Sequence, residues 1–188
     1  MSVQPERRLF DVDEYHRMAE VGILTDEDRV ELIDGEILTM SPIGHRHHYA
    51  VMFLTEALVR GLNGRAVVSP QGPIRLHRWT EPQPDVMLLQ PPLTRYARGT
   101  AGPADALLII EVADSSQYRD RVVKLPRYAA AGVREVWIVD VQAEAVEVYR
   151  DPSPKGYRDA GRAARGDRVA PEAFADLTLA VDDIFGPA

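Results

Sequence analysis

The sequence predicts a mixed α/β (α+β) fold, in which helices flank a central mixed β-sheet. Two apolar runs, at 106–113 and 133–141, are typical of strands that are buried on both faces. Residues 45–62 place apolar side chains such as Leu54 and Leu58 on one face of a long amphipathic helix. The expected order is helix, hairpin, helix, several strands, helix and two strands, which indicates a mixed sheet with helices packed on it.

The first elements are a helix and a hairpin. Residues 10–23 carry apolar side chains at helical spacing, and Gly22 is expected to stop that helix. Asp-Gly at 34–35 lies between two apolar runs, which is a strong hairpin signal. We therefore expect paired strands at 29–33 and 36–40, followed by the long helix.

The middle of the chain is rich in strand signals. Short strands are expected at 65–70 and 73–77, and a buried strand at 82–91. The segment 91–104 is rich in proline and glycine and is expected to be a loop. The run at 106–113 is the most apolar of the chain, so we expect it in the centre of the sheet with both faces covered.

A helix is expected at 117–131, with an interruption at Pro126. Proline removes the N–H that would bond to the carbonyl of Val122, and its ring clashes there. The helix is followed by a buried strand at 133–141 and a neighbouring strand at 144–151, joined by a short turn. This arrangement brings the two strands side by side as a hairpin.

The tail has weaker strand signals, and no change in composition separates it from the rest of the chain. Its candidate strands and its short apolar close lie at 156–161, 168–170 and 177–185. We expect one domain over residues 1–188, with a core at about 10–150 and a C-terminal β extension at about 151–188.

Composition excludes several classes of protein. The chain has no cysteine, which excludes a disulfide framework, a thiol nucleophile and thiolate zinc sites. We expect a cytoplasmic protein without membrane attachment, because no apolar leader opens the chain and no run approaches the about 18 apolar residues of a span. The net charge of −7 argues weakly against nonspecific DNA coating, since a carboxylate-rich metal site adds negative charge locally. A glycine-rich phosphate loop is absent, which argues against an NTPase.

Two carboxylates adjoin strongly apolar runs. Asp85 begins a strand after Pro84, and Glu111 lies near the end of the most apolar strand. Burying an unpaired carboxylate costs several kcal/mol, on the order of 3–5, so such groups need partners. A divalent cation is one such partner, and Mg²⁺ prefers carboxylates together with waters and phosphate oxygens. Two alternatives stay open, that Asp85 caps a turn and that Glu111 pairs with a buried basic residue.

Glu31 and Lys124 are the next candidates. Glu31 opens the first hairpin, and its plain alternative is a solvated strand-edge residue. Lys124 follows Asp120 by four residues on one helical face, where an ion pair contributes about 0.3–0.5 kcal/mol. If Lys124 instead lies near a metal, its ammonium can orient the attacking water or stabilise charge on a phosphate. Trp137 and Tyr128 are expected in the core.

The sequence resembles a known family of nucleases. Pro84-Asp85 and Ile110-Glu111-Val112 are similar to the motif of the PD-(D/E)XK nuclease superfamily. The segments VELIDGEILTMSPIGHRH, IIEVADSS and EVYR resemble, more narrowly, a bacterial restriction-endonuclease-like branch long catalogued as a domain of unknown function. The longest matching block is D-x-x-x-K-L-P-x-Y-A-x-x-G-V-x-E-V-W-I-V-D, at 120–140. That block is specific, and the resemblance covers roughly residues 10–185.

The resemblance implies a restriction-endonuclease-like core that holds Mg²⁺ or Mn²⁺ on Asp85 and Glu111, with Glu31 joining the site. The superfamily pattern has a lysine two residues after the glutamate, where this chain has Ala113. In this branch the lysine comes from the next helix, which gives the role to Lys124. Otherwise the catalytic base is missing.

Three histidines cluster at the start of the long helix. The spacing of His45, His47 and His48 does not place all three on one face, and structural zinc needs four ligands. We expect His45 and His48 to be exposed. The resemblance implies that His47 contacts a phosphate of the substrate or shapes the pocket.

Three functions follow from these expectations. The first is a metal-dependent endonuclease that hydrolyses phosphodiester bonds, of DNA more than RNA, and acts as a homodimer. The second is a catalytically inactive nuclease-fold binding module, which Ala113 and the acidic charge favour. The third is a metal hydrolase that acts on another phosphate ester.

Overall fold

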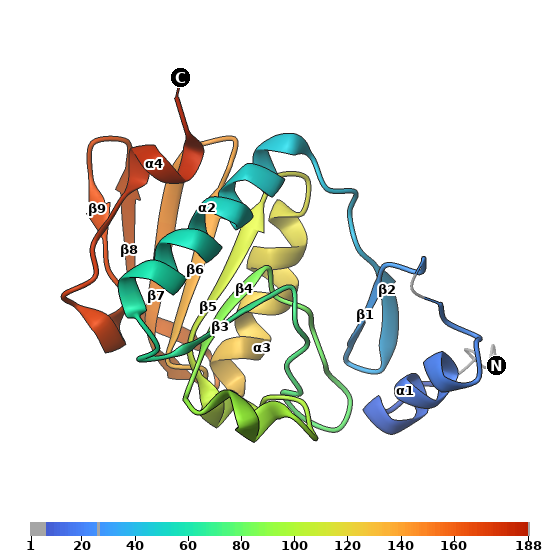
Figure 1. Ribbon diagram of the computed structural model, residues 1–188. Helices are drawn as coiled ribbons and strands as arrows, with labels where there is room; N and C mark the ends of the chain where they lie inside the picture. Colours follow the sequence, from blue (N-terminus) through green and yellow to red (C-terminus); the bar gives the residue numbers. More distant parts are fainter. Residues whose placement is uncertain (1–6, 26, 188) are drawn as a thin grey trace.

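The centre of the protein is a six-stranded mixed sheet with one helical layer on each face (Figure 1). The structure is a computed structural model that describes residues 7–25 and 27–187. Strand order is β3-β4-β5-β6-β7-β8, in which only β5 and β6 pair in parallel. The strands are β3 (Val67–Pro70), β4 (Val86–Leu89), β5 (Ala106–Ala113), β6 (Glu135–Asp140), β7 (Ala145–Ser153) and β8 (Gly156–Ala164).

Helix α2 (His45–Leu62) covers one face of the sheet, and α3 (Leu125–Ala130) covers the other. On the α2 side, Leu54 and Leu58 are fully buried against side chains of β4, β5 and β6. On the α3 side, Tyr128 is fully buried in a second apolar cluster. The apolar runs of β5 and β6 follow from this arrangement, because strands covered on both faces have no polar side. The prediction of a central mixed sheet flanked by helices is confirmed.

The crossover between the parallel strands β5 and β6 contains a π-helix, η3 (Arg119–Lys124), which runs directly into α3. The amide of Leu125 donates to the carbonyl of Asp120, five residues back, instead of four. Pro126 follows at once and has no N–H to continue an α-helical pattern. The interruption expected at Pro126 therefore takes the form of a wide turn that precedes the proline.

The hairpin of β1 (Val30–Ile33) and β2 (Glu36–Thr39) lies beside the sheet with α1 (Val12–Glu20), at the right of Figure 1. Its turn has positive φ at Asp34 (51°) and Gly35 (79°), the backbone that a two-residue hairpin needs. A Cβ at Gly35 would lie 2.8 Å from the Cβ of Leu9, so glycine also permits the close packing of the preceding segment. The hairpin attaches to the chain before β4 through the bridge between Leu32 and Glu81.

The segment 73–77, predicted as a strand, forms only isolated bridges within the part of the chain that the structure describes. Ile74 and Leu76 are buried, as the alternating pattern indicates. Their amides, however, donate to the carbonyls of Pro82 and Thr80. These bonds to 80–82 are too few to form a regular strand, so the prediction of a strand is wrong there.

The tail extends the sheet and completes the core. β8 is longer than the predicted 156–161, and Leu179 and Ile184 pack into the same cluster as α2. Among residues 7–25 and 27–187, no helix is long and apolar enough to cross a membrane. The remaining elements are η1 (Leu93–Tyr96), η2 (Pro103–Asp105), β9 (Arg168–Val169), η4 (Glu172–Phe174), β10 (Leu179–Ala180) and α4 (Val181–Phe185).

Candidate active site

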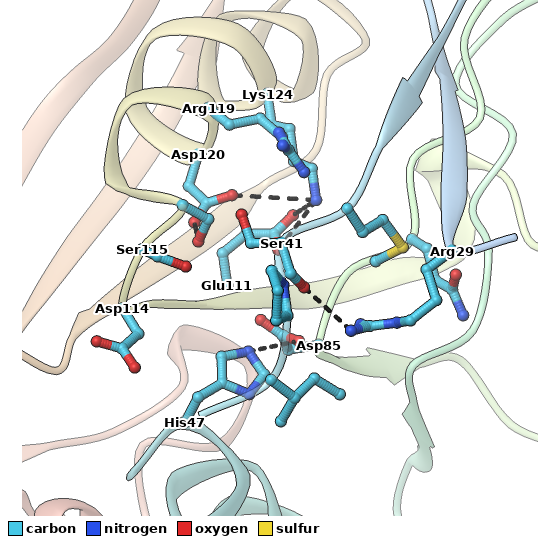
Figure 2. A pocket seen from close by; sticks show the side chains of 15 residues that line it. Arg29, Ser41, His47, Asp85, Glu111, Asp114, Ser115, Arg119, Asp120 and Lys124 are labelled. Carbon is cyan, nitrogen blue, oxygen red and sulfur yellow. Dashed lines mark hydrogen bonds and ion pairs between the residues drawn. The ribbon is translucent and has the colours of Figure 1, made fainter. Parts of the chain in front are cut away.

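A small polar pocket opens where β4 begins and β5 ends, bordered by the first turns of α2 and by η3 (Figure 2). Its cavity volume of about 40 Å³ is enough for more than one water. Four of the five site residues predicted from the sequence line it, and the fifth, Glu31, contacts the lysine among them. The four are Asp85, Glu111, Lys124 and His47.

Asp85 and Glu111 stand opposite each other on adjacent antiparallel strands. Val86 pairs with Ile110, so the residue before Val86 faces the residue after Ile110. Directly opposed residues of an antiparallel pair point to the same face of the sheet. The backbone N–H of Val112 donates to Oδ2 of Asp85 at 2.8 Å, which fixes this carboxylate against the end of β5.

Glu111 is a buried carboxylate with a full set of partners. It is 2% exposed, and the hydroxyl of Tyr128 donates to its Oε1 at 2.6 Å. The ammonium of Lys124 lies 3.2 Å from the same oxygen. Burial raises the pKa of Glu111 well above its ordinary value; the Lys124 ammonium opposes the rise, and the neighbouring Asp120 carboxylate adds to it.

Lys124 projects from η3 into a cage of carboxylates. Its Nζ lies 3.0 Å from Oε2 of Glu31 and 4.0 Å from Oδ1 of Asp120, and the residue is 4% exposed. Burial lowers the pKa of Lys124, but the charges of Glu111 and Glu31 outweigh it, so the pKa lies above its ordinary value and the amine stays protonated. The pair with Asp120, expected from helical spacing, is the longest of its three ion pairs.

Glu31 is not a solvated edge residue. It is 1% exposed, and its Oε2 accepts hydrogen bonds from Lys124 and from the backbone N–H of Gln83. Its Oε1 has no hydrogen-bond partner among the described residues, although Arg119 approaches to 3.8 Å. A buried, unpartnered carboxylate oxygen leaves room for a further cationic or protic group beside Lys124.

His47 extends from the first turns of α2 toward Asp85, with Nε2 at 3.1 Å from Oδ1. Burial lowers the pKa of His47, but the hydrogen bond and charge of Asp85 outweigh it, so the pKa is raised above its ordinary value. Its Nδ1 is buried and has no partner within the described ranges. His45 and His48 are exposed, as their positions at the helix start indicated.

The donor set fits a hard divalent cation. The carboxylates of Asp85, Glu111 and Asp120 line the pocket together with the hydroxyl of Ser41 and the imidazole of His47 (Figure 2). No three His, Asp or Glu groups stand ready as ligands among residues 7–25 and 27–187. Mg²⁺ suits such a site, because it is commonly held by one or two carboxylates and completes its shell with waters and substrate oxygens.

Two residues were given lesser roles from the sequence. Asp120 was considered only as an ion-pair partner, yet it is 2% exposed and lines the pocket. Tyr128 was expected only in the core, but its hydroxyl holds Glu111. The spacing D-x-x-x-K-x-x-x-Y marks one helical face and predicts that all three act together. A further signal is that the chain has two lysines among its 22 basic residues, and one of them is Lys124.

Comparisons with known proteins agree with this architecture. A family described as "Uma2: Putative restriction endonuclease" matches residues 12–182. A crystal structure described as "a putative nuclease belonging to DUF820", from Anabaena variabilis ATCC 29413, is similar, with a TM-score of 0.74 and 18% sequence identity over 94% of this chain and 97% of that one. No curated protein matches the sequence. The family match spans nearly all of the sheet and every candidate site residue, and the chain belongs to the Uma2 family of restriction-endonuclease-like proteins.

Proposed function

We propose that the protein is a metal-dependent endonuclease that hydrolyses phosphodiester bonds of DNA in the cytoplasm. The observation that carries the proposal is the position of the Lys124 ammonium, 3.2 Å from Glu111 in a pocket that Asp85 also lines. Two carboxylates can hold a divalent cation, and an ammonium beside them can stabilise the charge that develops when water attacks a phosphate. The family match supports a nuclease in general terms.

In this proposal Asp85 and Glu111 hold Mg²⁺ or Mn²⁺. The cation, when bound, supplies a positive charge that polarises the scissile phosphoryl group and lowers the pKa of a nearby water. The N–H of Val112 and the hydroxyl of Tyr128 keep the two carboxylates oriented. Each of these side chains is thereby placed before substrate arrives, which reduces the reorganisation that the reaction requires.

Lys124 acts as an ammonium. Because Glu111 and Glu31 raise its pKa, Lys124 donates hydrogen bonds to the attacking water and to phosphate oxygens instead of taking a proton. Glu31 is a positioning residue that holds the ammonium at 3.0 Å. His47, whose pKa is raised by Asp85, contributes a second donor toward a substrate phosphate.

The test is cleavage of a plasmid or a labelled DNA duplex with Mg²⁺ or Mn²⁺. Asp85→Asn and Glu111→Gln should each lower the rate by more than about 100-fold, because loss of an outer-shell partner alone costs about 10–100-fold. Asp183→Asn and Glu56→Gln are matched controls on exposed side chains and should keep the wild-type rate. Equal cleavage by wild type and Asp85→Asn would show a contaminating nuclease and remove the assignment.

A second candidate is a nuclease-fold binding module without turnover. Ala113, which is fully buried beside Glu111, stands where the superfamily pattern has a lysine. Calorimetry with Mn²⁺, read together with the cleavage assay, separates the two functions. Both predict a binding heat that Glu111→Gln removes, but only the enzyme cleaves. Metal binding with no cleavage of DNA or RNA would favour the binding module.

We also propose a homodimer, since nucleases that cut both strands are often dimers and most soluble oligomers are two-fold dimers. The exposed C-terminal strand β8 is the expected interface, because it is an edge of the sheet among the described strands. Light scattering coupled to size-exclusion chromatography gives the mass in solution. A mass of one 21.0 kDa chain at all concentrations would remove this part of the proposal.

A further inference from the structure

A second cavity adjoins the candidate active site. Its volume of about 420 Å³ lies in the range of small-molecule sites. We call it the side pocket and define it by Tyr15, Arg29, Met40, Ile43, Gln71 and Gln83. Both cavities are lined by Arg29, Met40, Ile43, Gln83 and Asp85, and the two adjoin along this shared wall. A ligand that reaches Asp85 can therefore continue into the side pocket.

The lining of the side pocket combines apolar surface with side-chain amides. Tyr15, Met40 and Ile43 provide the apolar part, and Gln71 and Gln83 provide the amides. Nucleobases stack on aromatic side chains, and amides of this kind pair with the edge of adenine. The carboxylate at the rim, Asp28, is occupied by hydrogen bonds from Thr25.

Arg29 stands at the shared wall with its charge unpaired. Its Nη1 donates to the carbonyl of Ser41 at 3.0 Å, and it forms no ion pair with any described residue (Figure 2). The neighbouring Arg119 and Arg127 each approach a carboxylate, at Glu31 and Asp34. A guanidinium that keeps its planar set of donors free suits a phosphate oxygen pair.

Gln71 lines the side pocket, and its backbone is held by two hydrogen bonds. Its φ is 49°, a left-handed conformation that is strained for glutamine. Its N–H donates to the carbonyl of Asp85 at 2.9 Å, and its carbonyl accepts from the side-chain amide of Gln83 at 2.5 Å. The amide group of Gln71 itself makes no hydrogen bond within the described part of the chain, so it is available to a ligand.

We propose that the side pocket binds one unpaired nucleobase of the substrate strand, next to the scissile phosphodiester, while Arg29 holds the phosphate between them. This inference rests on the proposed nuclease function. A base inside the pocket cannot remain stacked and paired, so the favoured substrate is single-stranded DNA or a strand with an unpaired nucleotide, in preference to intact duplex.

The test compares two labelled pentamers in EDTA, one of deoxyadenylate and one with the same phosphate backbone but no bases. Fluorescence anisotropy gives both affinities. Wild type should bind the adenine pentamer about tenfold more tightly than the abasic one, because stacking and amide contacts need a base. Gln71→Ala should bring this ratio close to one. Arg29→Gln should weaken both pentamers about equally, because phosphate is common to them.

Gln90→Ala and Arg134→Gln are the matched controls, since neither residue lines either cavity, and both should keep wild-type affinities. Thermal unfolding checks that all four variants are folded. Equal affinity of wild type for both pentamers, or binding of neither, would overturn the side-pocket proposal. Base-dependent binding without any cleavage would overturn the proposed function alone, and cleavage without a base preference would overturn the side pocket alone.

Discussion

Replacement of Lys124 by methionine tests the buried charge network directly. Methionine keeps most of the side-chain volume and removes the ammonium that lies 3.0 Å from Glu31 and 3.2 Å from Glu111. Both carboxylates are at most 2% exposed, so bulk water does not compensate for the lost partner. Removing one partner of a buried ion pair costs about 3–5 kcal/mol. For a chain of this length that corresponds to a fall in melting temperature of about 6–20 °C.

The pH dependence of this loss has a definite sign. Burial and the surrounding carboxylates already raise the pKa of Glu111 in the folded state, and removal of the ammonium raises it further. A carboxyl with a raised folded-state pKa contributes stability at low pH and loses it as the pH rises through that pKa. The deficit of Lys124→Met should therefore be smaller at pH 5 than at pH 8.

The assay is urea unfolding of wild type, Lys124→Met and Lys155→Met at several pH values, without divalent cations. Lys155, the other lysine of the chain, is exposed and should tolerate the change within about 0.5 kcal/mol. Adding Glu31→Gln to Lys124→Met should recover part of the loss, because one uncompensated charge is removed. A free energy of unfolding for Lys124→Met within about 1 kcal/mol of wild type would refute the network as described.

Three further predictions concern stability. Tyr128→Phe should cost about 1.5–3 kcal/mol by chemical denaturation, because it removes a buried hydrogen bond to the carboxylate of Glu111; no change would mean that this bond is not formed. Asp34 has its pKa lowered by the guanidinium of Arg127, so its contribution is present above the unfolded-state pKa and is lost as the pH falls; Asp34→Asn should flatten the stability profile between about pH 5 and 3. Leu58→Ala, at a fully buried position of α2, should cost about 2–5 kcal/mol by urea denaturation, and a smaller loss would contradict the packing.

The buried parts of the fold could be predicted from the sequence, because the patterns that indicate them are local. The run at 106–113 has the same bounds as β5, since a strand covered on both faces must be apolar throughout. The alternation of apolar and polar side chains at 73–77 predicted correctly which side chains are buried, but it did not predict how the backbone of this segment pairs. The amides of that segment bond to two separate stretches of chain, at 80–82 and at Ala101, and nothing within the segment encodes which ones.

The candidate site could be predicted from the sequence where its residues lie at strand ends. It was harder to predict where its residues meet through the packing of the hairpin beside the sheet. Apolar flanks marked Asp85 and Glu111. The approach of Glu31 to Lys124 joins residues 93 positions apart through the docking of a hairpin beside the sheet, and no local pattern encodes that contact. The sequence did not predict the π-helical turn itself. It indicated only an interruption of the helix at Pro126. A proline indicates that a helix is disturbed, but the packing of its neighbours decides the form.

The wide turn of η3 has a consequence for the direction in which the Lys124 side chain points. Successive helical residues are rotated by about 100° around the axis. One deletion or insertion between Asp120 and Lys124 would therefore rotate the amine away from the cavity and leave every strand in register. The strands of the sheet determine where the carboxylates of Asp85 and Glu111 lie. The rotation of one helical turn determines whether the Lys124 ammonium reaches them.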